Sequence, residues 1–130
     1  MKQWIRKVSD VWNIDAEAGP IYAQIVRGVE RMLASGKMKP GDKLPSAREL
    51  AAELRVNPNT VIHAFSQLEI AGVTETRRGL GTFIREDVKV EGMRLRLLRE
   101  AAQRFLNEVR AIGLSAEDAK KAISEVGGGE

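Results

Sequence analysis

The stretch V-N-P-N-T-V-I-H-A-F, residues 56–65, carries both a helix start and an unusual polar face. Asn57 can accept a hydrogen bond from a free backbone N–H of the first turn, and Pro58 suits the first helical position because no N–H is needed there. The helical spacing then places four apolar residues on one face: Val61, Ala64, Phe65 and Leu68. The opposite face carries mainly short hydrogen-bonding groups in place of Lys and Glu: Asn59, Thr60, Ile62, His63, Ser66 and Gln67. Because such groups near a helix start suit base edges, the stretch predicts a DNA recognition helix.

The sequence before this stretch predicts two further helices. The first starts at Pro20 and stops at Gly36. Its inward-facing residues recur at helical spacing: Ile21, Ile25, Val29, Met32 and Leu33. Pro40-Gly41 then predicts a tight turn, because glycine supplies the positive φ of a type II turn.

The second predicted helix follows Pro45 and begins with a capping box. Ser46 can cap the helix while the Glu49 side chain reaches back to the cap. Its inward-facing residues are Leu50, Ala51 and Leu54. Only residues 55–57 separate it from the recognition helix, and this spacing is typical of a helix-turn-helix. A generic pair of packed helices is the alternative at this point.

After the recognition helix, two short β-prone runs flank a glycine-containing turn. The runs are 73–77 and 82–85, and the turn is R-G-L-G at 78–81. A hairpin in this position makes the fold a winged helix-turn-helix, with Arg77 and Arg78 at the wing tip, placed for phosphate or minor-groove contact. R-G-L-G-T lacks the Lys-Ser/Thr of a phosphate-binding loop, so tight-turn glycines explain it better than a nucleotide site does.

The C-terminal part predicts two amphipathic helices after a linker at 87–93. The first begins at Arg94 and ends at Gly113; Ser115 and Asp118 cap the second, whose inward residues are Ala119, Ala122, Ile123 and Val126. Two such helices cannot close a core alone, so we expect 94–130 to be a dimerisation domain. The expected dimer contacts are Leu95, Leu98, Ala102, Phe105, Leu106, Val109, Ile112 and Ile123.

Residues 1–19 are predicted to form an N-terminal arm with a short strand at 11–15 and a turn at 16–19. Trp4 and Trp12 can tether the arm to residues 20–86, the predicted DNA-binding domain. The alternative is an arm that contacts DNA through Lys2, Arg6 and Lys7.

The composition limits the classes of function. The 130 residues are 43% hydrophobic and 30% charged, and the net charge of +3 permits a nucleic-acid partner without requiring one. There is no cysteine and one histidine, so a metal site is not expected. The sequence has no signal peptide and no apolar run of the roughly 18 residues that a membrane span needs, so we expect a cytoplasmic protein without membrane contact.

Several motifs resemble the GntR family of bacterial transcription regulators. They are P-I-Y-A-Q-I at 20–25, G-D-K-L-P-S-A-R-E-L-A at 41–51, V-N-P-N-T-V at 56–61, L-E-I-A-G-V at 68–73 and R-G-L-G-T-F-I at 78–84. The similarity covers about residues 11–86. The short C-terminal part, with G-L-S-A-E-D at 113–118, resembles the YtrA subfamily, in which about two helices form the dimer.

The resemblance implies roles for individual residues. Arg48 matches an arginine that contacts DNA in the family, and Arg78 with Gly79 matches a wing tip that enters the minor groove. With candidate phosphate contacts and helix starts added, the expected DNA-binding set is Lys43, Ser46, Arg48, Asn57, Asn59, Thr60, His63, Arg77, Arg78 and Gly79. His63 stands where YtrA-like proteins usually have arginine, so it could change the base preference, whereas Phe65, in place of tyrosine, should keep a core role.

The expected function is therefore a sequence-specific transcription regulator, more often a repressor in this subfamily, that binds a palindromic operator as a homodimer. No enzymatic activity, cofactor or metal is expected. The main alternative is a ligand-responsive regulator with a small-molecule effector site between the C-terminal helices. A DNA-binding part of an aminotransferase-like enzyme and a protein-binding adaptor are the alternatives from other classes.

Overall fold

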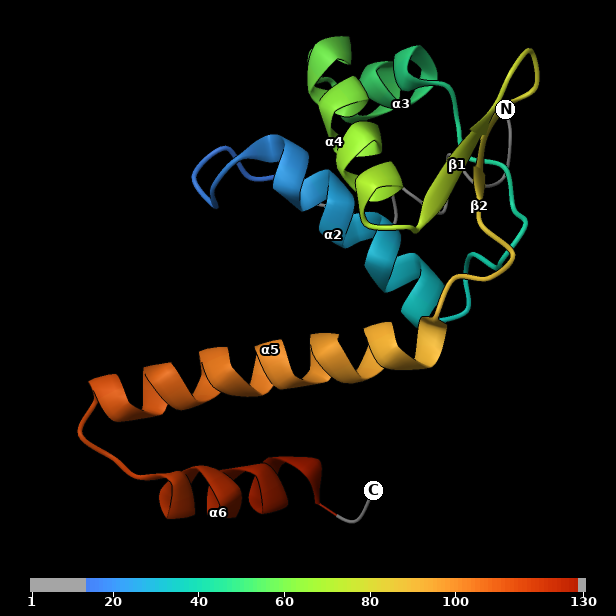
Figure 1. Cartoon of the computed structure of the whole chain (residues 1–130). Helices are drawn as coiled ribbons and strands as arrows, with labels where there is room; N and C mark the ends of the chain where they lie inside the picture. Colours follow the sequence, from blue (N-terminus) through green and yellow to red (C-terminus); the bar gives the residue numbers. More distant parts are fainter. Residues whose placement is uncertain (1–13, 129–130) are drawn as a thin grey trace. The chain divides into compact units, whose positions relative to one another are not determined.

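The computed structural model describes residues 14–128 in two compact units, one ending at Val90 and the next beginning at Glu91 (Figure 1). We call these unit 1 and unit 2. The elements in order are α2 (Ile21–Ala34), α3 (Ala47–Leu54), α4 (Pro58–Ile70), β1 (Thr74–Arg77), β2 (Gly81–Ile84), α5 (Val90–Ala111) and α6 (Ala116–Gly127). The predicted mainly helical fold with a small hairpin is confirmed.

The segment before α2 is held by one glutamine. The Gln24 amide nitrogen donates to the carbonyls of Asp15 at 2.7 Å and Gly19 at 3.1 Å, and its oxygen accepts from the Asp15 N–H at 3.0 Å. The predicted turn at 16–19 is present, but Ile14 and Asp15 are not in a strand. The rest of that strand and the proposed roles of the arm's tryptophans and cations lie outside the described residues.

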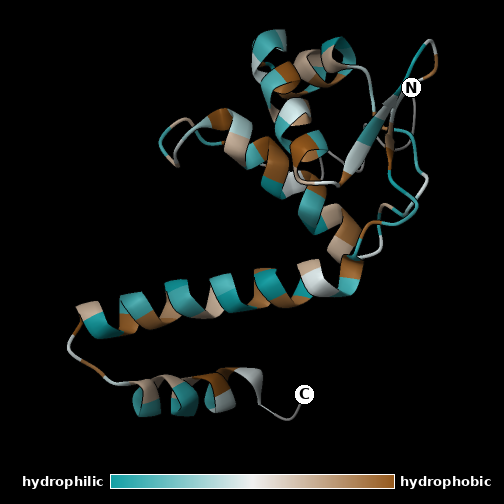
Figure 2. Ribbon diagram, viewed as in Figure 1, coloured by the Kyte–Doolittle hydropathy of each residue, from teal (hydrophilic) through white to brown (hydrophobic). Residues whose placement is uncertain are grey.

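The core of unit 1 is built by the helix faces that the apolar spacing predicts. The fully buried residues there include Ile25, Val29, Met32, Leu33, Leu50, Val61, Leu68 and Ile84. Figure 2 shows hydrophobic segments of α2, α3 and α4 gathered toward one another. Burying one such aliphatic side chain contributes about 1.5–3 kcal/mol. Phe65 and Leu54 are only half-buried, so Phe65 belongs to the rim of the core.

The hairpin has an antiparallel register in which Thr74 pairs with Ile84 and Arg77 with Gly81. Gly79 has φ 77°, and the Leu80 N–H donates to the Arg77 carbonyl at 2.9 Å. A side chain with a Cβ would strain this left-handed position, which explains the glycine in the turn.

A third extended segment joins this sheet beside β2. Lys43 bridges Phe83, the Leu44 N–H donates to the Thr82 carbonyl at 2.8 Å, and the Ile84 N–H donates to the Asp42 carbonyl at 2.8 Å. The preceding turn is of the predicted type: Asp42 N–H donates to the Lys39 carbonyl at 3.0 Å, and Gly41 has φ 88°. The sequence did not reveal the third segment, because four residues are too few to show a period.

In unit 2, α5 begins at Val90, so the expected start at Arg94 and the expected linker up to residue 93 are wrong. Glu91 explains the early start. Its carboxylate lies in the first turn, where it complements the helix dipole, and it pairs with Arg94 at 2.6 Å. The helix therefore gains a first turn, which also includes the buried Met93.

The helices α5 and α6 run in opposite directions, and hydrophobic and hydrophilic segments alternate along both (Figures 1 and 2). Val109 and Ala119 are buried. Ile123 and Val126 were expected inside, but within this chain they are 58% and 89% exposed. Two helices have too little surface to enclose both of their apolar faces.

Candidate nucleic-acid interface

The start of α3 presents Arg48 on a well-capped helix. The Ser46 hydroxyl accepts from the Glu49 N–H at 3.1 Å, and the Glu49 carboxylate accepts from the Ser46 N–H at 3.1 Å. The oxygen of the Ser46 hydroxyl is therefore engaged as the helix cap, while its O–H can still donate to a ligand. Arg48 is exposed and forms no ion pair within residues 14–128, so its guanidinium is available to a ligand.

The start of α4 uses Asn57 in the same way. Its side-chain oxygen accepts from the Asn59 N–H at 2.8 Å, and Pro58 occupies the first helical position. Asn57 is thus a structural cap, whereas Asn59 projects an exposed amide and Thr60 a half-buried hydroxyl from the first turn. These two side chains are the ones that α4 offers at its N-terminal end.

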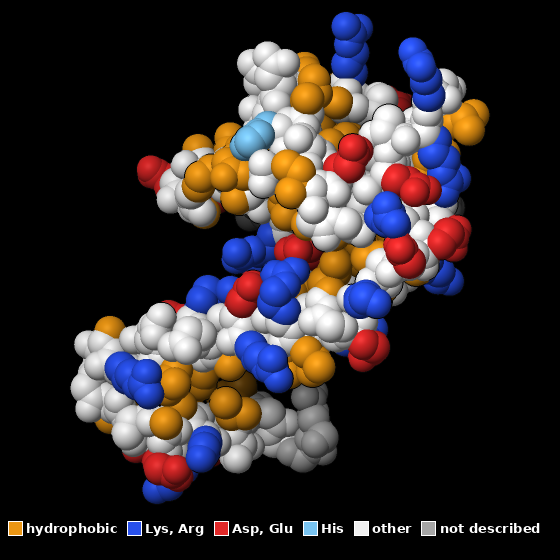
Figure 3. Space-filling view, viewed as in Figure 1, with side chains coloured by type: hydrophobic (Ala, Val, Ile, Leu, Met, Phe, Trp, Pro, Cys, Tyr) orange, Lys and Arg blue, Asp and Glu red, His pale blue; other side chains and the backbone are white. Residues whose placement is uncertain are grey.

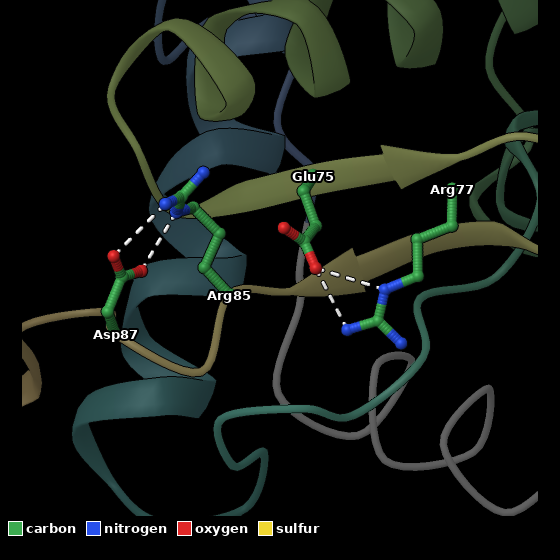
Figure 4. Close-up of polar contacts among 4 residues, drawn as sticks. All are labelled: Glu75, Arg77, Arg85 and Asp87. Carbon is green, nitrogen blue, oxygen red and sulfur yellow. Dashed lines mark hydrogen bonds and ion pairs between the residues drawn. The ribbon is translucent and has the colours of Figure 1, made fainter.

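The arginines of the wing differ in their surroundings (Figure 4). Arg77 pairs with Glu75 at 2.8 Å, and its guanidinium lies 4.2 Å from the ring centre of Phe83. Arg85 makes two hydrogen bonds to Asp87, at 2.8 and 3.0 Å. These bonds raise the pKa of Arg85 and lower the pKa of Asp87, the side-chain hydrogen bond being the largest cause of each shift. Arg78 is exposed in the turn and pairs with no carboxylate of the described chain.

His63 lies against an aromatic ring that the sequence interpretation did not include. The ring centres of His63 and Tyr22 are 4.1 Å apart, with a tilt of 57°. The contact joins α2 to α4 and limits how the exposed imidazole can move. The spacing of P-I-Y-A-Q-I could not show it, because the partner is far along the chain.

A groove of about 540 Å³ separates the start of α3 from the wing. It is lined by Lys43, Leu44, Pro45, Ser46, Ala47, Glu49, Ile62, Phe65, Ser66, Glu69, Thr76, Gly81 and Thr82. Lys43 is one of these lining residues, and the carbon atoms of its side chain pack beside Gly81. Two of the lining residues are hydrogen-bonded to each other: the Thr76 hydroxyl donates to the Glu69 carboxylate at 2.8 Å.

The helix starts and the wing tip lie at one end of unit 1, at the top of Figure 1. Basic side chains extend into solvent at that end (Figure 3). We call the surface formed by Arg48, Asn59, Thr60 and Arg78 the DNA face. Its arrangement joins a helix-turn-helix to a basic hairpin tip, the arrangement by which such folds meet a duplex.

Comparison with known proteins identifies the family. Residues 21–84 match the family described as "Bacterial regulatory proteins, gntR family". The chain is 41% identical over 105 residues to the HTH-type transcriptional regulator YhcF of Bacillus subtilis, covering 80% of this chain and 87% of YhcF. The chain belongs to the GntR family. It is also 41% identical over 110 residues to the HTH-type transcriptional repressor YtrA of Bacillus subtilis, covering 82% of this chain and 84% of YtrA.

A solved structure supports the same assignment. The GntR family transcriptional regulator from Listeria monocytogenes aligns with a TM-score of 0.76 and 31% identity, over 85% of this chain and 98% of that one. The chain is a DNA-binding transcriptional regulator with a winged helix-turn-helix, and the predicted GntR and YtrA-like resemblance is confirmed. Its relatives are transcriptional regulators, a class distinct from enzymes. No helix within residues 14–128 is long and apolar enough to cross a membrane.

Proposed function

We propose that this GntR-family regulator is a homodimeric, non-enzymatic repressor that acts in the cytoplasm and binds a palindromic operator through two copies of the DNA face. The observation that carries the proposal is the placement of free cations. Arg48 and Arg78 come from different elements of unit 1, lie on the DNA face and form no ion pair within the described chain. Phosphates supply most of the affinity in such complexes, and an unpaired guanidinium can meet them without first breaking an internal bond.

Specificity is assigned to the groups that can reach base edges. Arg48 can donate a bidentate pair to guanine, and Asn59 and Thr60 offer short donors and acceptors at the start of α4. His63 is a weaker candidate, because its ring already lies against Tyr22. Lys43, Arg77 and the backbone at Gly79 are assigned to positioning on the sugar-phosphate chain.

The homodimer is supported by the exposed apolar face of unit 2. Leu98 and Ile112 are 65% and 73% exposed, although both belong to the apolar stripe of α5. Exposed leucine and isoleucine at helical spacing need a second apolar surface, and another copy of the same helices supplies one of matching chemistry. A two-fold pair of DNA faces then suits a palindromic operator.

The test compares two arginines of the DNA face on DNA selected by the protein from a random-sequence pool. Arg48→Ala should lose most of the preference for the selected duplex over a random one, on the order of 1–3 kcal/mol. Arg78→Ala should weaken binding to both duplexes alike. Fluorescence anisotropy measures both affinities. Unchanged preference in Arg48→Ala would remove its base-reading role.

Arg77→Ala is the matched control within the wing. Its guanidinium is already held by Glu75 and Phe83, so we expect a smaller loss of affinity than in Arg78→Ala. Thermal unfolding of each variant checks that the hairpin remains folded. Equal losses in the two variants would contradict the distinction between free and paired wing arginines.

A further inference from the structure

Arg55, between α3 and α4, has a left-handed backbone. Its φ is 58° and its ψ is 49°, and within residues 14–128 no other residue except glycine has positive φ. For a residue with a Cβ this conformation is strained, because the side chain crowds the following carbonyl. The strain is located in the turn of the helix-turn-helix, directly before the recognition helix.

The fold needs the left-handed turn but does not need an arginine in it. The N–H groups of Arg55 and Val56 both donate to the Ala51 carbonyl, which ends α3 and redirects the chain toward Asn57, the cap of α4. Glycine adopts this turn without the crowding and is the residue that such helix ends favour. The stability of the fold alone would therefore favour glycine at this position.

The Arg55 side chain makes no compensating contact with the described part of the chain. It is exposed, and it forms no hydrogen bond, ion pair or ring contact with any residue from 14 to 128. Its Cα can be no more than about 7.6 Å from that of Asn57, since consecutive Cα atoms are about 3.8 Å apart. The backbone of Arg55 thus lies within two residues of the cap of α4, the helix whose first turn carries Asn59 and Thr60.

We propose that Arg55 binds a backbone phosphate of duplex DNA, on the strand that flanks the groove entered by the start of α4. The inference rests on the proposed DNA face and adds a residue that neither the apolar spacing nor the family motifs indicate. In a helix-turn-helix complex the recognition helix reads bases while the first helix crosses the sugar-phosphate backbone, and Arg55 lies in the turn that joins the two. A guanidinium fits a phosphate with two parallel hydrogen bonds, and the DNA contact compensates for the backbone strain.

The experiment uses Arg55→Gly, because the stability of the fold should rise while the affinity for DNA falls. The full chain is titrated onto a labelled random-sequence duplex at several salt concentrations, and its thermal unfolding is followed in parallel. We expect a higher melting temperature together with affinity reduced on the order of tenfold. The slope of log affinity against log salt should become shallower by about 0.9 for each copy of the chain on the duplex.

Two further variants separate charge from conformation. Arg55→Lys keeps the cation and the strained backbone, so it should keep most of the salt slope. Arg55→Asn tolerates the left-handed conformation without charge, so its DNA binding should match that of Arg55→Gly. Lys37→Gln removes one exposed cation from the loop after α2, at the other end of unit 1, and controls for net charge (Figure 1).

The outcomes distinguish this inference from the proposed function. If Arg55→Gly keeps the wild-type affinity and salt slope while Arg48→Ala and Arg78→Ala lose binding, the phosphate role of Arg55 is wrong and the DNA face stands. The same conclusion follows if Arg55→Gly loses no more affinity than Lys37→Gln. If none of the variants changes DNA binding, the proposed face itself is wrong.

Discussion

In unit 1, α2 and α4 bury Ile25, Val61 and Leu68 completely, whereas in unit 2 the corresponding stripe of α5 leaves Leu98 and Ile112 mostly exposed. Both units use amphipathic helices with capped starts. Among residues 14–128, unit 1 has three helices and a hairpin with which to enclose the stripes, and unit 2 has two helices. An apolar stripe therefore indicates that one face of a helix must be buried. The number of neighbouring helices and strands decides whether the same chain can bury it.

The largest expected effect is the loss of stability when a leucine is removed from the buried core of unit 1, compared with the exposed stripe of unit 2. Leu68→Ala should lower the free energy of unfolding by about 2–5 kcal/mol, because a fully buried leucine leaves a cavity in unit 1. Urea unfolding followed by circular dichroism measures the loss. Leu98→Ala is the matched leucine in unit 2, and at high dilution it should lose far less. Equal losses at high dilution would show that α5 is covered within the single chain.

A charge placed on the exposed apolar stripe of α5 tests whether a second copy of the chain covers that stripe. Leu98→Asp should raise the dimer dissociation constant by roughly a hundredfold, since a carboxylate without a counter-ion would be buried against the second copy. Light scattering after size-exclusion chromatography over a concentration series reports the change. Gln103→Glu adds a carboxylate outside the stripe and should keep the wild-type assembly. A dimer that survives Leu98→Asp would place the interface elsewhere.

The two capping boxes allow the same substitution in each unit. Ser46→Ala and Ser115→Ala each remove an acceptor for a free backbone N–H at the start of a helix. Each should cost about 1 kcal/mol of stability. Hydrogen exchange of α3 and α6 measures the effects separately, and we expect each to be confined to its own unit. Loss of protection in both units from one substitution would contradict their independence.

Replacing the buried hydroxyl of Thr74 should stabilise unit 1 slightly. It is 1% exposed, and its hydroxyl has no hydrogen-bond partner among the described residues. Thr74→Val keeps the shape and removes the buried hydroxyl, so stability should rise by about 1 kcal/mol. Thermal unfolding measures the change, and Thr76→Val, which breaks the hydroxyl bond to Glu69, should not raise stability. A lower melting temperature for Thr74→Val would mean that the hydroxyl is satisfied in solution.

The smallest expected effect is a pH dependence at the start of α6. Hydrogen bonds from the Ser115 backbone N–H and then from its hydroxyl lower the pKa of Asp118 below its ordinary value of 3.8. Because the folded-state pKa is the lower one, the contribution is present above pH 3.8 and is lost as the pH falls through the folded value. Circular dichroism on acidification should show a slightly earlier loss of helix in the wild type than in Asp118→Asn. Identical acid transitions would remove Asp118 from this role.

How far sequence reasoning succeeded depended on the range of each interaction. Ser46, Asn57 and Ser115 could be predicted as caps because a cap and its donor lie within three residues. The start of α5 was misplaced because the expected apolar stripe began at Leu95, although Val90 and the buried Met93 lie three residues apart in the first turn. Spacing marked Ile123 and Val126 as members of an apolar face, but it does not say whether the same chain or a second copy covers that face.

The candidate site was predictable in its location but not in the state of each side chain. The order of motifs placed Arg48, Asn59 and Arg78 on one DNA-binding unit. The sequence predicted both arginines at the wing tip, whereas Arg77 ends β1 and is held by Glu75, and Arg78 lies in the turn and pairs with no carboxylate of the described chain. Spacing could not single out Arg55, because a left-handed backbone is visible only in the folded turn.

The sequence by itself determined the helices, their caps, the hairpin and the family, because these depend on local hydrogen bonding, apolar period and motif order. Only the tertiary structure decided the bridge from Lys43 to Phe83, the contact of His63 with Tyr22 and the pairing of the wing arginines. Folding brings Lys43 to Phe83 and His63 to Tyr22 from distant parts of the chain, which no single stretch of sequence specifies. Glu75 and Arg77 share one face of β1 because they are two residues apart, and the folded hairpin shows that their side chains pair.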